Sequence, residues 1–113
     1  MDFQTYQEKA RGTAKYPEAG DNFMYPGLGL MGEAGEVADK LKKLMRDQGI
    51  FKPSQTSDEF RADLKKELGD VLWYVAQLSS EFGLSMEEVA VGNIDKLYSR
   101  LNRGVLGGNG DNR

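Results

Sequence analysis

Residues 60–82 carry the feature that most constrains the fold, a long run of apolar side chains at helical spacing. The repeat comprises Phe60, Leu64, Leu68, Val71, Leu72, Val75, Leu78 and Phe82. Glu67 and Asp70 lie inside this run, three residues apart. At about 100° per residue, Glu67 points roughly 20° from Phe60 and Leu78, and Asp70 lies about 60° further round. The pattern predicts a long helix with two carboxylates along the margin of its buried face.

A half-buried carboxylate is unfavourable unless a cation or hydrogen-bond donors compensate its charge. An isolated pair such as Glu67 and Asp70 is most simply neutralised by a neighbouring Lys or Arg. A second acidic pair changes this interpretation, because Glu33 and Glu36 have the same spacing in another amphipathic segment. For Glu36 alone, an exposed pair with Lys40 one helical turn later remains an alternative.

The second acidic pair belongs to residues 28–48, which are predicted to form a helix that ends at Gly49. Gly32 and Gly35 lie inside this helix, where each glycine costs about 1 kcal/mol relative to alanine. We therefore expect these two glycines to permit the close approach of another backbone segment or of a ligand.

The remaining segments are also helical in pattern, and no alternating strand pattern occurs in the chain. The first expected helix runs from an Asp2 N-cap to about Lys15, and a loop over 16–27 leads to the helix over 28–48. A third helix is expected from a Thr56–Glu59 capping box to Phe82. A fourth is expected from a Ser85–Glu88 capping box to about Asn102. They predict an all-α fold, an antiparallel four-helix bundle-like domain over residues 1–103. Residues 104–113 contain four glycines and are expected to form a flexible tail.

The middle of the third predicted helix, VLWYVA at residues 71–76, is apolar on nearly every side. Trp73 lies opposite the main apolar face, and a helix that is apolar all round is buried on all sides. In a domain this small, such burial indicates a subunit interface. We therefore expect a homo-oligomer, a dimer or tetramer, with Trp73 between subunits.

The composition limits which catalytic groups and metal ligands the chain can offer. The chain has 113 residues, a net charge of −3, and neither cysteine nor histidine. These absences exclude thiolate and imidazole catalysis and metal sites built on Cys or His, and no basic field exists to hold a nucleic-acid backbone. No apolar segment reaches the length of a membrane span, and the N-terminus lacks a signal-peptide core. We expect a cytoplasmic protein without nucleic-acid or membrane partners.

The predicted helices can be aligned by counting residues from their connections. If the second and third helices pack antiparallel, as their short connection favours, Glu36 lies opposite Gly69 and the two acidic pairs share one level. The same count along the last helix places Lys96 and Arg100 at that level, with Asn93 on the same edge. Four carboxylates form an all-oxygen site suited to Mg²⁺ or Mn²⁺. The side chains of Asn93, Lys96 and Arg100 can donate hydrogen bonds to phosphate oxygens. Alternatively, these three side chains are simply solvated at the border of the apolar face and have no role in binding.

These segments resemble the MazG-like nucleoside triphosphate pyrophosphohydrolases of the all-α NTP pyrophosphatase superfamily. The resemblance covers most of the chain and rests on GLGLMGEAGEVADKLKK, KKELGDVLWYVAQL and NIDKLYSR. It implies a Mg²⁺ site formed by Glu33, Glu36, Glu67 and Asp70, and phosphate contacts from Asn93 and Lys96. Thirty residues lie between the two acidic pairs, at or beyond the long end of the family's usual spacer.

The resemblance and the carboxylate pattern together predict Mg²⁺-dependent hydrolysis of (deoxy)nucleoside triphosphates to the monophosphate and pyrophosphate. Glu33 or Glu36 would orient or deprotonate the attacking water, and Lys96 and Arg100 would stabilise the polyphosphate charge. Two alternatives stay open. One is the same fold acting on dUTP or phosphoribosyl-ATP, as relatives in the superfamily do, and the other is a non-catalytic helical oligomerisation or adaptor module.

Overall fold

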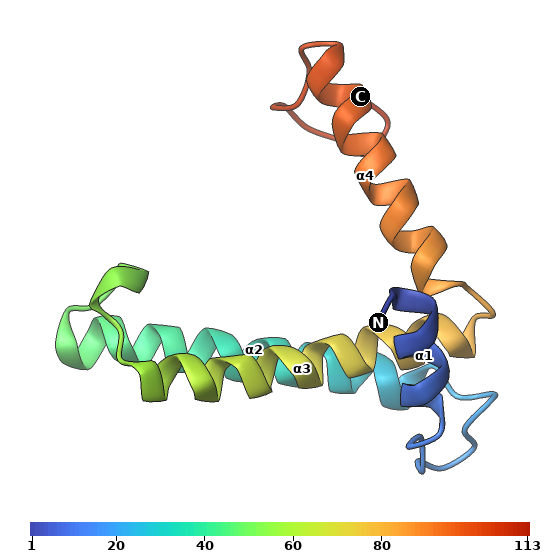
Figure 1. Ribbon diagram of the computed structural model, residues 1–113, viewed down its shortest axis with the longest axis horizontal. Coiled ribbons are helices and arrows are strands. Elements are labelled where there is room, and N and C mark those ends of the chain that lie inside the picture. The colour runs from blue at the N-terminus through green and yellow to red at the C-terminus, as the bar shows by residue number, and fades with distance from the viewer.

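Two long antiparallel helices, α2 (Met24–Gln48) and α3 (Asp58–Glu81), form the frame of the molecule (Figure 1). The computed structural model describes all residues, 1–113. α2 ends at Gly49, which adopts a left-handed φ of 65° and returns its N–H to carbonyls of the last turn. After a short 3₁₀ turn, η1 (Pro53–Gln55), the Ser57 side chain begins α3 by accepting a hydrogen bond from the third amide of the helix. The chain thereby doubles back, and α3 packs along α2.

Two helix boundaries differ from the predicted positions. α1 spans Phe3–Arg11 and ends before the predicted Lys15. α2 begins at Met24, four residues before the predicted start, because Asn22 Oδ1 accepts hydrogen bonds from the Met24 and Tyr25 amides at 3.0 and 3.2 Å. The side chain of Asn22 thus satisfies amides that would otherwise lack a partner at the start of a helix.

α1 packs against α3 and covers the side of that helix that carries Trp73. The buried hydrophobic residues are few, Ala10, Tyr16, Ala76 and Met86, and the Trp73 ring packs against the cluster of Ala10, Ala76 and Met86. The indole N–H of Trp73 donates a hydrogen bond to Thr13 Oγ1 at 2.8 Å. α1 and Thr13 therefore contact Trp73 within the chain and leave it half-buried, and its further burial between subunits stays a prediction.

Gln7 on α1 sets the direction of α4 (Met86–Asn102). Its side chain accepts a hydrogen bond from the Met86 amide at 2.8 Å. It also donates to Ser80 Oγ at 3.0 Å and to the Leu84 carbonyl at 2.9 Å. α4 consequently starts against α1 and the end of α3, and then projects away from the α2/α3 pair (Figure 1).

The all-α prediction is confirmed, with four α-helices and no strand. Within this fold, α4 contacts α1 and α3 but not α2, so it does not lie along the acidic helices as the residue count predicted. Residues 104–113, the expected flexible tail, fold back onto the end of α4 (Figure 1). No helix combines the length and the apolar character that crossing a bilayer requires.

Candidate metal centre

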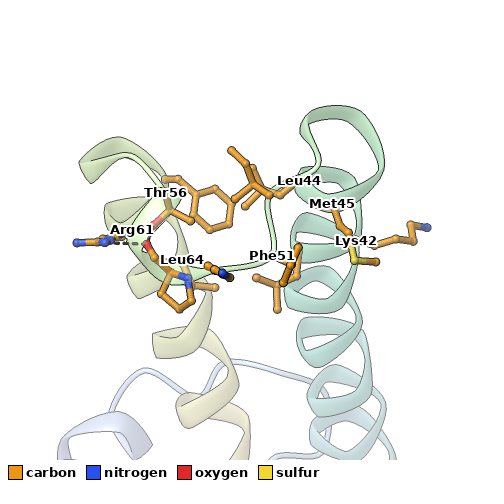
Figure 2. Close-up of a pocket in the computed structure, with 12 residues that line it drawn as sticks. Lys42, Leu44, Met45, Phe51, Thr56, Arg61 and Leu64 are labelled. Carbon is orange, nitrogen blue, oxygen red and sulfur yellow. Dashed lines mark hydrogen bonds between the residues drawn. The ribbon is translucent and has the colours of Figure 1, made fainter.

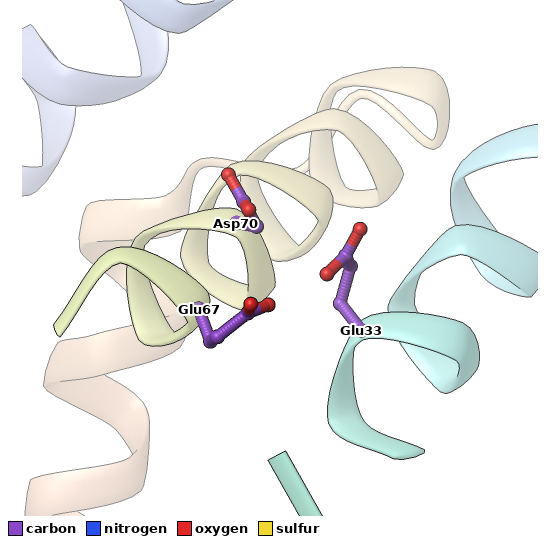
Figure 3. A group of neighbouring side chains, drawn as sticks. All are labelled: Glu33, Glu67 and Asp70. Carbon is purple, nitrogen blue, oxygen red and sulfur yellow. The ribbon is translucent and has the colours of Figure 1, made fainter. Parts of the chain in front are cut away.

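α2 and α3 bring three carboxylates together between them (Figure 3). One oxygen from each of Glu33, Glu67 and Asp70 lies within 4.8 Å of the other two. Glu67 and Asp70 are one turn apart on α3, and Glu33 faces them from α2. Side chains three residues apart share one face of a helix, so the antiparallel packing directs both α3 carboxylates toward α2.

The group carries more negative charge than its neighbours compensate. Glu33 and Glu67 are half-buried and Asp70 is exposed. One Glu33 oxygen, Oε2, is buried and has no hydrogen-bond partner. Burial, followed by the charges of Glu36, Asp70 and Glu67, raises the pKa of Glu33 above its usual value. The compensating ion pair runs from Lys40 Nζ to Glu67 Oε1, at 3.7 Å.

This donor set fits a hard divalent cation. All three converging ligands are carboxylate oxygens, the type that Mg²⁺ and Mn²⁺ prefer. A buried polar atom without a partner is rare in a native structure, and a cation at this point would supply one for Glu33 Oε2. The group could therefore hold a metal ion.

Glu36 lies outside the group of three, exposed and one turn further along α2. It lines an open groove with Gly32, Gly35 and Lys40, beside Glu67. A Cβ atom at Gly32 or Gly35 would meet no atom within 4 Å, so neither glycine serves a close approach within the chain. Lys40 also departs from the expected pair with Glu36, since it reaches across to Glu67.

Gly29 is the helical glycine that close packing requires. A Cβ atom at this position would lie 2.1 Å from Tyr74 Cε1. Tyr74 follows Asp70 by four residues and therefore lies on the same side of α3 as the acidic group. Burial, then Tyr25 and the charges of Glu33 and Asp70, raises the pKa of Tyr74. Sequence reasoning missed Tyr74, although its helical spacing from Asp70 was a usable signal.

Asn93, Lys96 and Arg100 all lie on α4 and are not brought to the acidic group within one chain. Lys96 Nζ and Arg100 Nη2 instead approach Asp111 Oδ1, at 3.3 and 3.4 Å. The predicted alignment assumed that α4 returns along α3, whereas the hydrogen bonds of Gln7 turn the helix away. Asp111 was not among the predicted site residues, because a glycine-rich tail has no helical period from which to place it.

An apolar hollow of about 340 Å³ lies further along α2 and α3, beside their connection (Figure 2). Its lining includes Leu41, Met45, Phe51, Phe60 and Leu64, with Lys42, Lys52 and Arg61 among the polar residues. It contains no carboxylate, so it has no ligands of the kind that a hard cation needs. We therefore place the candidate metal centre at the acidic group and not in this hollow.

Comparison with known proteins identifies the family. A family model described as the MazG nucleotide pyrophosphohydrolase domain matches residues 27–105, which include the whole acidic group. The gene 37 protein of Mycobacterium phage L5 is 47% identical over 118 aligned residues that cover all of both chains. The uncharacterised protein YvdC of Bacillus subtilis strain 168 is 34% identical over 74 residues, 64% of this chain and 69% of that protein. No solved structure matches the chain significantly. By the extent of these matches, the chain belongs to the MazG nucleotide pyrophosphohydrolase domain family.

Proposed function

We propose that this protein hydrolyses nucleoside or deoxynucleoside triphosphates to the monophosphate and pyrophosphate with the help of Mg²⁺ or Mn²⁺. The observation that carries the proposal is the convergence of Glu33, Glu67 and Asp70, with a buried Glu33 oxygen that lacks a partner. In the reaction, water adds across the phosphoanhydride between the α and β phosphates. The P–O bond of that anhydride breaks, the monophosphate and pyrophosphate separate, and a base takes up the water proton.

The carboxylates of Glu33, Glu67 and Asp70 would hold the cation, with Glu36 as a neighbouring acidic ligand or base. When bound, the cation supplies Lewis-acid chemistry and offsets the negative charge of the polyphosphate. Glu36 is exposed beside the open groove, where water and substrate have access. We assign to Glu33 or Glu36 the orientation of the attacking water and the acceptance of its proton.

Asn93, Lys96 and Arg100 are proposed to contact the substrate phosphates. Amide, ammonium and guanidinium groups donate hydrogen bonds to phosphate oxygens, and the two cations strengthen those bonds. Because α4 does not contact α2 within the chain, we propose that a second copy supplies these residues to the acidic group.

Three features support assembly as a dimer or tetramer. Only eight of the 113 residues are buried, and the radius of gyration is 17.0 Å. A compact chain of this length has a radius of gyration of about 13 Å. α4 also leaves a row of large apolar side chains exposed: Val89, Val91, Ile94, Leu97, Tyr98 and Leu101. A second copy that covers this helix would bury the missing core.

A panel of nucleoside and deoxynucleoside triphosphates, assayed for pyrophosphate release with and without Mg²⁺, tests the proposal. We expect Asp70→Asn to abolish release, because it removes one of the three converging carboxylates. The matched control is Asp63→Asn, an exposed carboxylate two turns earlier on α3 without an ion pair, which should retain wild-type turnover. Equal turnover by both variants at saturating Mg²⁺ would show that the acidic group has no role in the reaction. A wild-type protein that releases pyrophosphate from no nucleotide would instead indicate an adaptor module.

A further inference from the structure

The C-terminal residues 104–113 form a closed loop on the last turns of α4. The Arg113 guanidinium donates hydrogen bonds to the carbonyls of Val105, Leu106 and Gly107 at 3.2, 2.9 and 3.0 Å. The Arg113 carbonyl in turn accepts a hydrogen bond from Arg103 Nη2 at 2.7 Å. The Arg113 side chain thus closes the segment into a loop, and Arg103, next to the end of α4, holds that loop against the helix. We call residues 104–113 the strap.

The strap places Asp111 against the two cations of α4. Arg100 Nη2 donates to the Asp111 carbonyl at 2.7 Å and to Asp111 Oδ1 at 3.4 Å, and these are the only hydrogen bonds of the Arg100 side chain. Lys96 Nζ donates to the same Oδ1 at 3.3 Å. Arg100 is only 5% exposed. A buried guanidinium requires such acceptors, so the strap both covers Arg100 and neutralises it.

A single carboxylate oxygen therefore lies where two cations converge, one helical turn apart on α4. Hydrogen bonding to Lys96 and Arg100, followed by their charges, lowers the pKa of Asp111. A phosphate oxygen, like a carboxylate oxygen, is an anionic acceptor for hydrogen bonds from Lys and Arg. In its contacts with Lys96 and Arg100, Asp111 imitates one oxygen of a phosphate group.

We propose that the strap is an autoinhibitory element, in which Asp111 competes with substrate phosphates for Lys96 and Arg100 and is displaced when a polyphosphate binds. This inference rests on the proposed function, which assigns those two cations to the substrate.

Displacement is favourable on two physical grounds. The Asp111 side chain is 85% exposed, so its ion pair with the partly exposed Lys96 contributes little and is screened by salt. Pyrophosphate and triphosphate groups carry several charges and more acceptor oxygens than one carboxylate, so they satisfy Lys96 and Arg100 more fully.

Binding of inorganic pyrophosphate to the full chain, measured by titration calorimetry, tests the competition. Asp111→Asn should bind pyrophosphate roughly three- to tenfold more tightly than the wild type, because it loses the charge of the exposed carboxylate but keeps the bond from Arg100 to the Asp111 carbonyl. Arg113→Lys keeps the charge but loses the planar fork that reaches several carbonyls, so it should open the strap and tighten binding as well. The matched control is Asp95→Asn, an exposed carboxylate on α4 without an ion pair, which should change the affinity far less.

Tryptic cleavage after Arg103, followed by intact mass, reports the position of the strap without any turnover. In the closed state the Arg103 side chain is held by Ser99 Oγ and by the Arg113 carbonyl, and we expect slow cleavage. Pyrophosphate should accelerate loss of the strap from the wild type, and Asp111→Asn should be cleaved at the faster rate without it.

The outcomes separate this inference from the proposed function. If Asp111→Asn binds pyrophosphate more weakly, Asp111 orients the cations and the competition is wrong. Unchanged affinity, unchanged cleavage, or a wild type that binds no pyrophosphate also overturns the autoinhibitory strap, even where nucleotide turnover is observed. Tighter binding and faster cleavage without turnover of any nucleotide would support the strap and reject the proposed hydrolase.

Discussion

Replacing Glu33 by Gln tests the acidic group most directly, because this variant removes one of three carboxylates whose oxygens lie within 4.8 Å of one another. Two unit charges at that separation repel by about 3 kcal/mol at an effective dielectric constant of 20, and by about 1 kcal/mol in bulk water. Glu33 is half-buried, so its repulsion falls between these limits. In the metal-free protein at low salt, we expect Glu33→Gln to raise the free energy of unfolding by about 1–3 kcal/mol.

Calorimetric melting in chelator measures this gain, at about 4 °C per kcal/mol for a chain of this size. The gain should shrink at high salt, since screening weakens repulsion between partly exposed charges. Added Mg²⁺ should stabilise the wild type and leave Glu33→Gln nearly unchanged. Asp63→Asn, the control for removal of a negative charge, should show no comparable gain. A metal-free Glu33→Gln protein that is less stable than the wild type would refute the reasoning, because Glu33 would then be favourably paired without a cation.

Three further predictions follow from the geometry. Mg²⁺ at 100 times its dissociation constant should stabilise the folded protein by about 2.7 kcal/mol in a thermal shift titration, whereas Ca²⁺ should bind but support little turnover. Gly29→Ala should destabilise the fold in urea titrations because its Cβ overlaps the Tyr74 ring, and Gly32→Ala, which meets open space, should be neutral or add up to about 1 kcal/mol of helix stability. Gln7→Ala should lower the free energy of unfolding by about 2–4 kcal/mol, since three hydrogen bonds are lost and the Met86 amide loses its acceptor; an unchanged urea midpoint would contradict the role given to Gln7.

The sequence alone predicted the helices and four carboxylates, of which the structure brings Glu33, Glu67 and Asp70 together. Apolar spacing and capping residues act within a few positions of each other, so the N-cap hydrogen bond of Ser85 to the Glu88 amide and the end of α2 at Gly49 could be read locally. Glu67 and Asp70 share a helix face by their spacing, and a short connection makes α3 antiparallel to α2. Placing Glu33 opposite them needed only these two local facts.

Tertiary contacts decided the direction of α4 and the partner of its cationic side chains. Gln7 bonds to Met86, 79 residues away, and Arg100 bonds to Asp111 in a tail without a periodic pattern. No local propensity encodes such pairings, because each depends on where the rest of the chain has already packed. The contact of Trp73 with α1 and Thr13 also depends on how distant segments pack, so apolar spacing along α3 did not predict it.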